Sequence, residues 1–377
     1  MATNPTSNEA IRDRMIQHQI RLVGLSVGMG RKLERLLRAV DQDVRDLIEK
    51  RLAPVTGIRP QFGKTRTARL IRLQAAIKDL QAPVWKEMRA ELRKELLELG
   101  VLEAATTAAT IQSSLPVIVS VALPSSTLMR KIIASQPFEG KILSQWVSEI
   151  ETSDRKRMMD QIRIGLVQGE STDTITRRVF GTSGQQYKDG TRQTTRRGVG
   201  AIVRTSVNFI TSQAREELYL ANKELIPEEL FVATLDANTT AVCRGLDGKR
   251  FEVGQGPQPP LHFNCRSLRL PLINGNVIGL RPAKAVTKDM LAGLSREERR
   301  DTVRRLTGQV PASQTYAEFL RNQPVQFQNE VMGKTKAALF RRGGLELDRF
   351  TNAAGKEYTI ADLRRLAPGA FGKAGID

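Results

Sequence analysis

The stretch RKLERLLRAVDQDVRDLIEK, residues 31–50, sets the class of the fold. Its apolar side chains recur every three or four residues, which places them on one face of an α-helix. The members of this face are Leu33, Leu36, Leu37, Val40, Val44, Leu47 and Ile48. The pattern predicts a helix over residues 8–52, bent or interrupted at its glycines, which are Gly24, Gly28 and Gly30. Residues 64–99 repeat the spacing past Pro83 and predict a second long helix.

Two arrangements of these helices stay open. They form an extended helical arm over residues 1–127, or they pack as an ordinary bundle. Residues 101–126 mix Ala, Thr and Ser with short apolar runs, a composition that fixes neither helix nor strand, so we expect a connector there.

Residues 128–280 and 281–377 predict two further parts, a core and a helical C-terminal region. Short β-type runs at residues 231–235 and 268–272 and the dipeptide Asp247-Gly248, a two-residue hairpin signal, place a small sheet in the core. In the C-terminal region, Ser295 and Thr315 open capping boxes and Thr359 can cap a final short helix. The predicted class is mainly α with a small α+β element: long N-terminal helices, a central helical body with a short β-hairpin or sheet, and a helical C-terminal part.

The charge balance predicts a polyanionic partner. Lys and Arg number 59 and Asp and Glu 40, a net charge of +19, which suits nucleic acid or an anionic membrane surface; a well-solvated basic surface is the alternative. Aromatic residues are only 5% of the chain, so contacts to DNA would be made to phosphates rather than by base stacking. Arg192, Arg196 and Arg197 begin a helix predicted over residues 194–224, where cations are unfavourable. We therefore expect them to contact phosphates, with a solvated face as the alternative.

Several classes of protein are excluded. Two cysteines do not make a disulfide-rich secreted scaffold, and two histidines, His18 and His262, nearly exclude a three-histidine zinc site. The longest apolar run, Leu115 to Leu123, is about half of the ~18–20 residues that a membrane span needs. The N-terminus has no apolar signal-peptide segment, so we expect no membrane span and synthesis in the host cytoplasm.

One group of residues has chemical content. Cys243, His262 and Cys265 fall within 23 residues, with the turn signal and a Pro/Gly loop between them, a spacing that zinc sites use. The position three residues before Cys243, where such sites often place another cysteine, is Thr240, a poor zinc ligand. Asp236 or a water molecule would then complete the set.

Four interpretations of this group stay open. It is a three-ligand zinc site, or a relic in which a hydrogen-bonded His262 and two small buried thiols hold the same loop without metal. It is a Cys243–Cys265 disulfide, which requires an oxidising compartment. Or it is a catalytic zinc with an open position, as in hydrolases and nucleases.

The same residues resemble a known family. TLDANTTAVCRGLDGKRFEVG, residues 234–254, and PPLHFNCR, residues 259–266, resemble the Mu F-like minor head (head morphogenesis) proteins of tailed bacteriophages. Their pattern is a "TLD" strand, a Cys-x-x-Cys, an "LDGK" turn and "PPLHPNCR". Thr240 stands at the family's first cysteine and Phe263 at its proline, so only Cys243, His262 and Cys265 carry over. The resemblance extends more softly over residues 138–365, including residues 204–217, 316–333 and 339–350.

The resemblance implies a structural, non-enzymatic virion protein. It would lie in the head interior near the portal, contact the portal protein and the major capsid protein, and take part in head assembly and in packaging or delivery of double-stranded DNA. No cofactor is implied, with zinc as the exception that the three ligands allow. The alternatives are a metal-dependent nuclease or other hydrolase using Cys243, His262 and Cys265, and a host DNA-binding module with a zinc-ribbon-like element.

Overall fold

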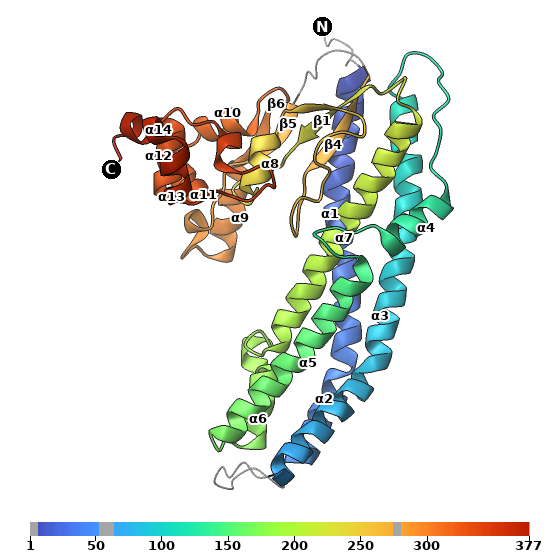
Figure 1. Cartoon of the computed structure of the whole chain (residues 1–377), viewed down its shortest axis with the longest axis vertical. Helices are drawn as coiled ribbons and strands as arrows, with labels where there is room; N and C mark the ends of the chain where they lie inside the picture. Colours follow the sequence, from blue (N-terminus) through green and yellow to red (C-terminus); the bar gives the residue numbers. More distant parts are fainter. Residues whose placement is uncertain (1–6, 53–63, 274–279, 377) are drawn as a thin grey trace. The chain divides into compact units, whose positions relative to one another are not determined.

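The computed structural model describes residues 7–52, 64–273 and 280–376, and Figure 1 shows its elements. The chain divides into two compact units, which we describe separately. The helical unit comprises Leu22–Val101 and Ser125–Ile210; the mixed unit comprises Met1–Arg21, Leu102–Pro124 and Thr211–Asp377. The predicted class, mainly α with a small β element, is confirmed. The predicted boundaries at residues 127 and 280 stay a prediction.

The helices of the first part of the chain follow one another closely. They are α1 (Ser7–Ala39), α2 (Asp41–Leu52), α3 (Lys64–Gln112), α4 (Ser126–Ser135), α5 (Leu143–Val167), α6 (Thr172–Phe180) and α7 (Arg192–Ala221). In the helical unit one apolar core joins side chains from both sequence segments, among them Val44, Ile77, Met158 and Val179. Packing of this kind agrees with the bundle alternative for these helices.

Two details of the long helices differ from prediction. The N-terminal helix is interrupted at Val40, and Gly24, Gly28 and Gly30 lie inside α1. A Cβ on Gly30 would stand in ordinary van der Waals contact with the Cα of Gly200, at 3.6 Å.

The predicted connector over residues 101–126 is wrong in its first half, because α3 continues to Gln112. Ala104, Thr107, Ala108 and Ile111 are buried at three- and four-residue spacing. Packing of these small side chains stabilises the helix where the intrinsic helix propensity of the sequence is weak.

The mixed unit holds two small sheets. One has the strand order β3-β1-β4, with β1 (Glu228–Val232) antiparallel to both β3 (Arg250–Glu252) and β4 (Leu268–Leu272). The other has the order β2-β5-β6, with β2 (Leu235–Asp236) parallel to β5 (Leu280–Lys284) and β5 antiparallel to β6 (Thr307–Pro311). The strands near residues 231–235 and 268–272 are confirmed.

The predicted two-residue hairpin at Asp247-Gly248 is wrong. A short helix, α8 (Ala241–Leu246), precedes the dipeptide, so β1 and β3 pair across a longer connection. Gly248 has φ +81°, and its N–H donates to the carbonyl of Phe231. The glycine thus supplies the left-handed turn, but between a helix and a strand.

The C-terminal part is helical around a core of its own. It contains α9 (Arg296–Arg305), α10 (Tyr316–Arg321), α11 (Val325–Met332), α12 (Lys334–Arg341), α13 (Ile360–Leu366) and α14 (Pro368–Ala374). The capping boxes of Ser295 and Thr315 are confirmed, and so is the cap of Thr359. Buried aromatic side chains such as Phe319, Phe327 and Phe340 build the core.

No helix within residues 7–52, 64–273 and 280–376 combines the length and the apolar run that crossing a bilayer requires.

Candidate metal centre

The structure brings the three predicted ligands together in the mixed unit. The Cys243 sulfur lies 3.8 Å from the Cys265 sulfur and 3.3 Å from Nε2 of His262. All three ligand atoms lie within 4.8 Å of one another. Both cysteines are buried and free, so the disulfide interpretation is not realised in this structure.

These separations fit a tetrahedral metal ion. Zinc–sulfur bonds of about 2.3 Å at tetrahedral angles separate two sulfurs by about 3.8 Å. A zinc–nitrogen bond of about 2.0 Å places the imidazole nitrogen about 3.5 Å from each sulfur. Two thiols and an imidazole are a donor set that zinc prefers, and the two separations that involve the Cys243 sulfur are close to these values.

Local turns set the ligands in place. Cys243 lies on α8, and His262 and Cys265 lie at the two ends of a turn closed by the Cys265 N–H donating to the His262 carbonyl, 3.1 Å. Asn264 in this turn has φ +60°, a left-handed conformation that asparagine tolerates better than most residues. Nδ1 of His262 lies 2.9 Å from the carbonyl of Phe263. A proton held on Nδ1 leaves the Nε2 lone pair directed at the sulfurs.

The two thiols affect each other's pKa in opposite directions. The hydrogen bond to Cys265, together with burial, raises the pKa of the Cys243 thiol. The hydrogen bond to Cys243, opposed by burial and helped by His262, lowers the pKa of the Cys265 thiol. A lowered pKa favours the thiolate, the form that binds metal.

Asp236 does not join the ligand group, and the suggestion that it supplies a fourth ligand is wrong. Both of its carboxylate oxygens accept hydrogen bonds from Arg266, at 2.5 and 2.9 Å. The metal-binding group found among the described residues contains Cys243, His262 and Cys265 alone. Burial acts to lower the pKa of Arg266. The hydrogen bond and charge of Asp236, and then the charges of Cys265 and Cys243, outweigh burial and raise this pKa.

Two of the three candidate phosphate-binding arginines are internal, so the expectation that they face an external anion is wrong. The Arg192 side chain is 1% exposed and pairs with Asp41 and Asp154 in the helical unit. Arg196 is buried and also pairs with Asp41. Carboxylates from α2 and α5 thus compensate the unfavourable position of these cations at the start of α7. Arg197 alone is exposed.

The sequence analysis missed a buried acidic cluster in the mixed unit. Glu229 on β1 lies 2.9 Å from Arg269 on β4, and both side chains are almost fully buried. Glu216 on α7 interacts with Glu229 and accepts a hydrogen bond from Gln258. Burial, and next the charge of Glu216, raises the pKa of Glu229 to about 8. The available signal was a charged residue in each of these short strands, Glu229 in β1 and Arg269 in β4, but the sequence does not tell that their side chains turn inward.

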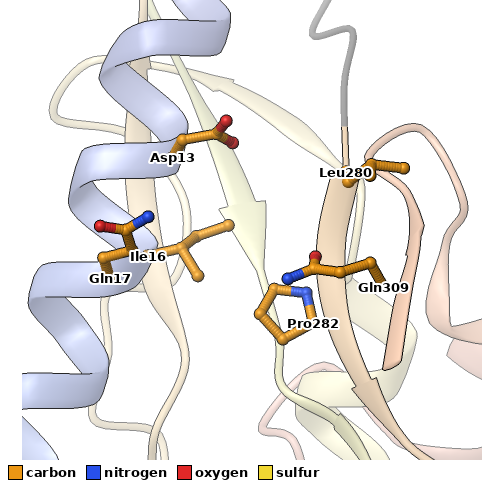
Figure 2. A pocket seen from close by; sticks show the side chains of 6 residues that line it. All are labelled: Asp13, Ile16, Gln17, Leu280, Pro282 and Gln309. Atoms are coloured by element: carbon orange, nitrogen blue, oxygen red, sulfur yellow. The ribbon is translucent and has the colours of Figure 1, made fainter. Parts of the chain in front are cut away.

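A recess of about 260 Å³ lies elsewhere in the mixed unit, between α1 and the strands β5 and β6 (Figure 2). Its walls are Asp13, Ile16, Gln17, Leu280, Pro282 and Gln309. None of the three ligand residues is among the described residues that line it, and of those six residues Asp13 is the ionisable one.

Comparison with known proteins agrees with the family named from the motif. Residues 156–269 match the family model described as Phage Mu protein F like protein. The match includes α7, strand β1, the first two residues of β4 and all three ligand residues. No curated protein and no solved structure matches this chain.

Proposed function

We propose, from the match of residues 156–269 to the Mu F-like phage family, that this protein is a minor component of a bacteriophage head. The observation that carries the proposal is that the matched segment contains the complete Cys243, His262 and Cys265 group in a folded, metal-compatible arrangement. As part of the proposal, the protein contacts the portal protein and the major capsid protein from the head interior. It is made in the host cytoplasm and enters the virion during assembly.

The proposed role is structural rather than enzymatic. The carboxylates that could act as a base near the three ligands are engaged elsewhere: Asp236 pairs with Arg266, and Asp247 pairs with Arg281. An imidazole that turns Nε2 toward two sulfurs suits a ligand better than a general base. The alternative, a metal-dependent nuclease or other hydrolase, would need an acid or base that these contacts do not leave free.

The three residues are proposed to hold a zinc ion that fastens the loop of residues 254–265 to α8. A bound Zn²⁺ would displace the protons of the two thiols, and folding and metal binding would then be coupled.

The proposal is tested by quantitative mass spectrometry of density-purified virions of the phage that encodes this chain. A few to some tens of copies per full head are expected. Loss of the protein after DNA release would indicate an ejected, DNA-associated component, and retention would indicate a fixed portal or capsid contact. Absence from the particles would overturn the head assignment and leave the hydrolase alternative.

A further inference from the structure

Thr240 holds an unusual position beside the three ligands. It is the N-cap residue of α8, yet its side chain makes no capping hydrogen bond. Threonine at this position ordinarily accepts a hydrogen bond from a backbone N–H of the first helical turn. The other N-cap threonines of the mixed unit, Thr315 and Thr359, do so.

The Thr240 hydroxyl instead lies beside the Cys243 sulfur, as the Ser267 hydroxyl also does. Its oxygen is buried and has no hydrogen-bond partner of acceptable geometry among the described residues. A buried hydroxyl without a partner is unfavourable, so a ligand that donated a hydrogen bond to it would satisfy it.

The ligand set has one position to fill. Three protein ligands leave a tetrahedral zinc ion with a fourth site, which a water molecule takes where no protein ligand reaches it. Asp236 is held away by Arg266, and a neutral threonine hydroxyl is a weak zinc ligand but a good hydrogen-bond acceptor.

We propose that the ion held by Cys243, His262 and Cys265 keeps a water molecule in its fourth position, and that this water donates a hydrogen bond to the Thr240 hydroxyl. This inference rests on the zinc site of the proposed function. It deepens that site, because the chain would carry an open, exchangeable coordination position where the family pattern supplies a cysteine. The site would accept a small anion in place of the water.

Three forms of the purified full-length chain test this arrangement: the wild type, Thr240→Val and Thr240→Cys. Valine keeps the shape of threonine and removes the hydroxyl, and cysteine restores a Cys-x-x-Cys pair with Cys243. Thr359→Val, which removes a capping hydroxyl far along the chain in α13, is the matched control. Zinc content, zinc affinity by chelator competition, and the visible spectrum of the Co²⁺-substituted protein with and without azide are measured.

The wild type is expected to hold one zinc per chain and to show a Co²⁺ spectrum that changes on addition of azide, because azide replaces the water. Thr240→Val should bind zinc about 10–100-fold more weakly, the usual effect of removing a group that orients a metal site. Thr240→Cys should bind zinc more tightly than the wild type and give a Co²⁺ spectrum insensitive to azide. Thr359→Val should leave both readouts unchanged.

These outcomes test the metal site and its open fourth position separately. A wild-type protein without zinc and without zinc affinity overturns the metal site itself, and with it this inference, while virion mass spectrometry still decides the head assignment. Zinc bound with unchanged affinity in Thr240→Val, or a wild-type Co²⁺ spectrum indifferent to azide, keeps the metal site and overturns the open position.

Discussion

At the scale of single residues, Asp247 stabilises the mixed unit through contacts with several elements. Its side chain is fully buried and accepts hydrogen bonds from the backbone N–H groups of Ala233 and Tyr316, each at 2.7 Å. Arg281 on β5 donates two more, at 2.9 and 3.0 Å. The aspartate of the "LDGK" motif therefore joins the end of β1, the start of α10 and β5. Asp247 stabilises the unit more through these hydrogen bonds than through the turn that the motif suggests.

Asp247→Asn should be strongly destabilising. The variant leaves the Arg281 guanidinium buried without its counter-charge, and breaking a buried ion pair costs about 3–5 kcal/mol. Asp348→Asn is the control, because Asp348 is half exposed and its pair with Lys249 is expected to contribute about 1 kcal/mol or less. Urea unfolding followed by circular dichroism measures both. Equal midpoints for the two variants would show that Asp247 has no such role.

At the scale of elements, α7, β1 and β4 are joined through the acidic cluster. Glu216, Glu229 and Arg269 provide two carboxylates for one guanidinium, so one carboxyl retains a proton. The raised pKa of Glu229 means that its protonated form favours the folded state. That contribution is fully present below the unfolded-state pKa of about 4.3, and it is lost as pH rises toward 8.

Glu229→Gln should remove this pH dependence. The variant's stability, compared with that of the wild type, should increase steadily from pH 5 to pH 8 and then level off, since glutamine has no proton to lose. Urea midpoints at pH 5, 7 and 9 provide the measurement. Glu228→Gln, which alters a half-exposed neighbour on the same strand, should show no such trend. A wild-type minus variant difference that is constant across these pH values would refute the shared proton.

The sequence predicts an element well when the interactions that form it join residues that are close together in the chain. Helical periodicity and capping boxes are local, and they located α9 and α10 well. Strand β5 contains Pro282 and two cations, so its sequence does not resemble a strand, and the residues that pair with it lie far away in the chain. The three candidate metal ligands could be singled out because a motif places them within one short stretch. The burial of Arg192 was missed because its partner Asp41 lies 151 residues away.

At the scale of the whole molecule, the buried arginines do not contribute to the external field. Arg192, Arg215 and Arg281 each face a carboxylate inside the protein. Since each of these pairs is neutral, none of them adds to the excess of +19. Contacts with DNA, which the charge balance of the sequence predicts, would then be made by exposed cations such as Arg197.

Binding to duplex DNA of arbitrary sequence should weaken steeply with salt. Each phosphate contact contributes about 0.9 to the slope of log affinity against log salt concentration. Arg197→Gln should lower that slope by about one if Arg197 contacts a phosphate. Arg177→Gln removes the same charge from an exposed arginine that already pairs with Asp173, and should change the slope less. Affinity that is flat between low and moderate salt would contradict phosphate contacts altogether.

The segment between α3 and α4 contains an exposed apolar run that favours self-association. Residues 117–123 are mostly apolar, and Val117, Ile118 and Leu123 are exposed, Ile118 fully so. Runs of six or seven residues with high β-propensity and no charge are the kind that assemble into cross-β stacks. Pro116 and Pro124 bracket the run and limit how far such a stack can extend along the chain. Concentrated samples should therefore self-associate through residues 117–123. Ile118→Lys should slow the loss of protein from solution in such samples.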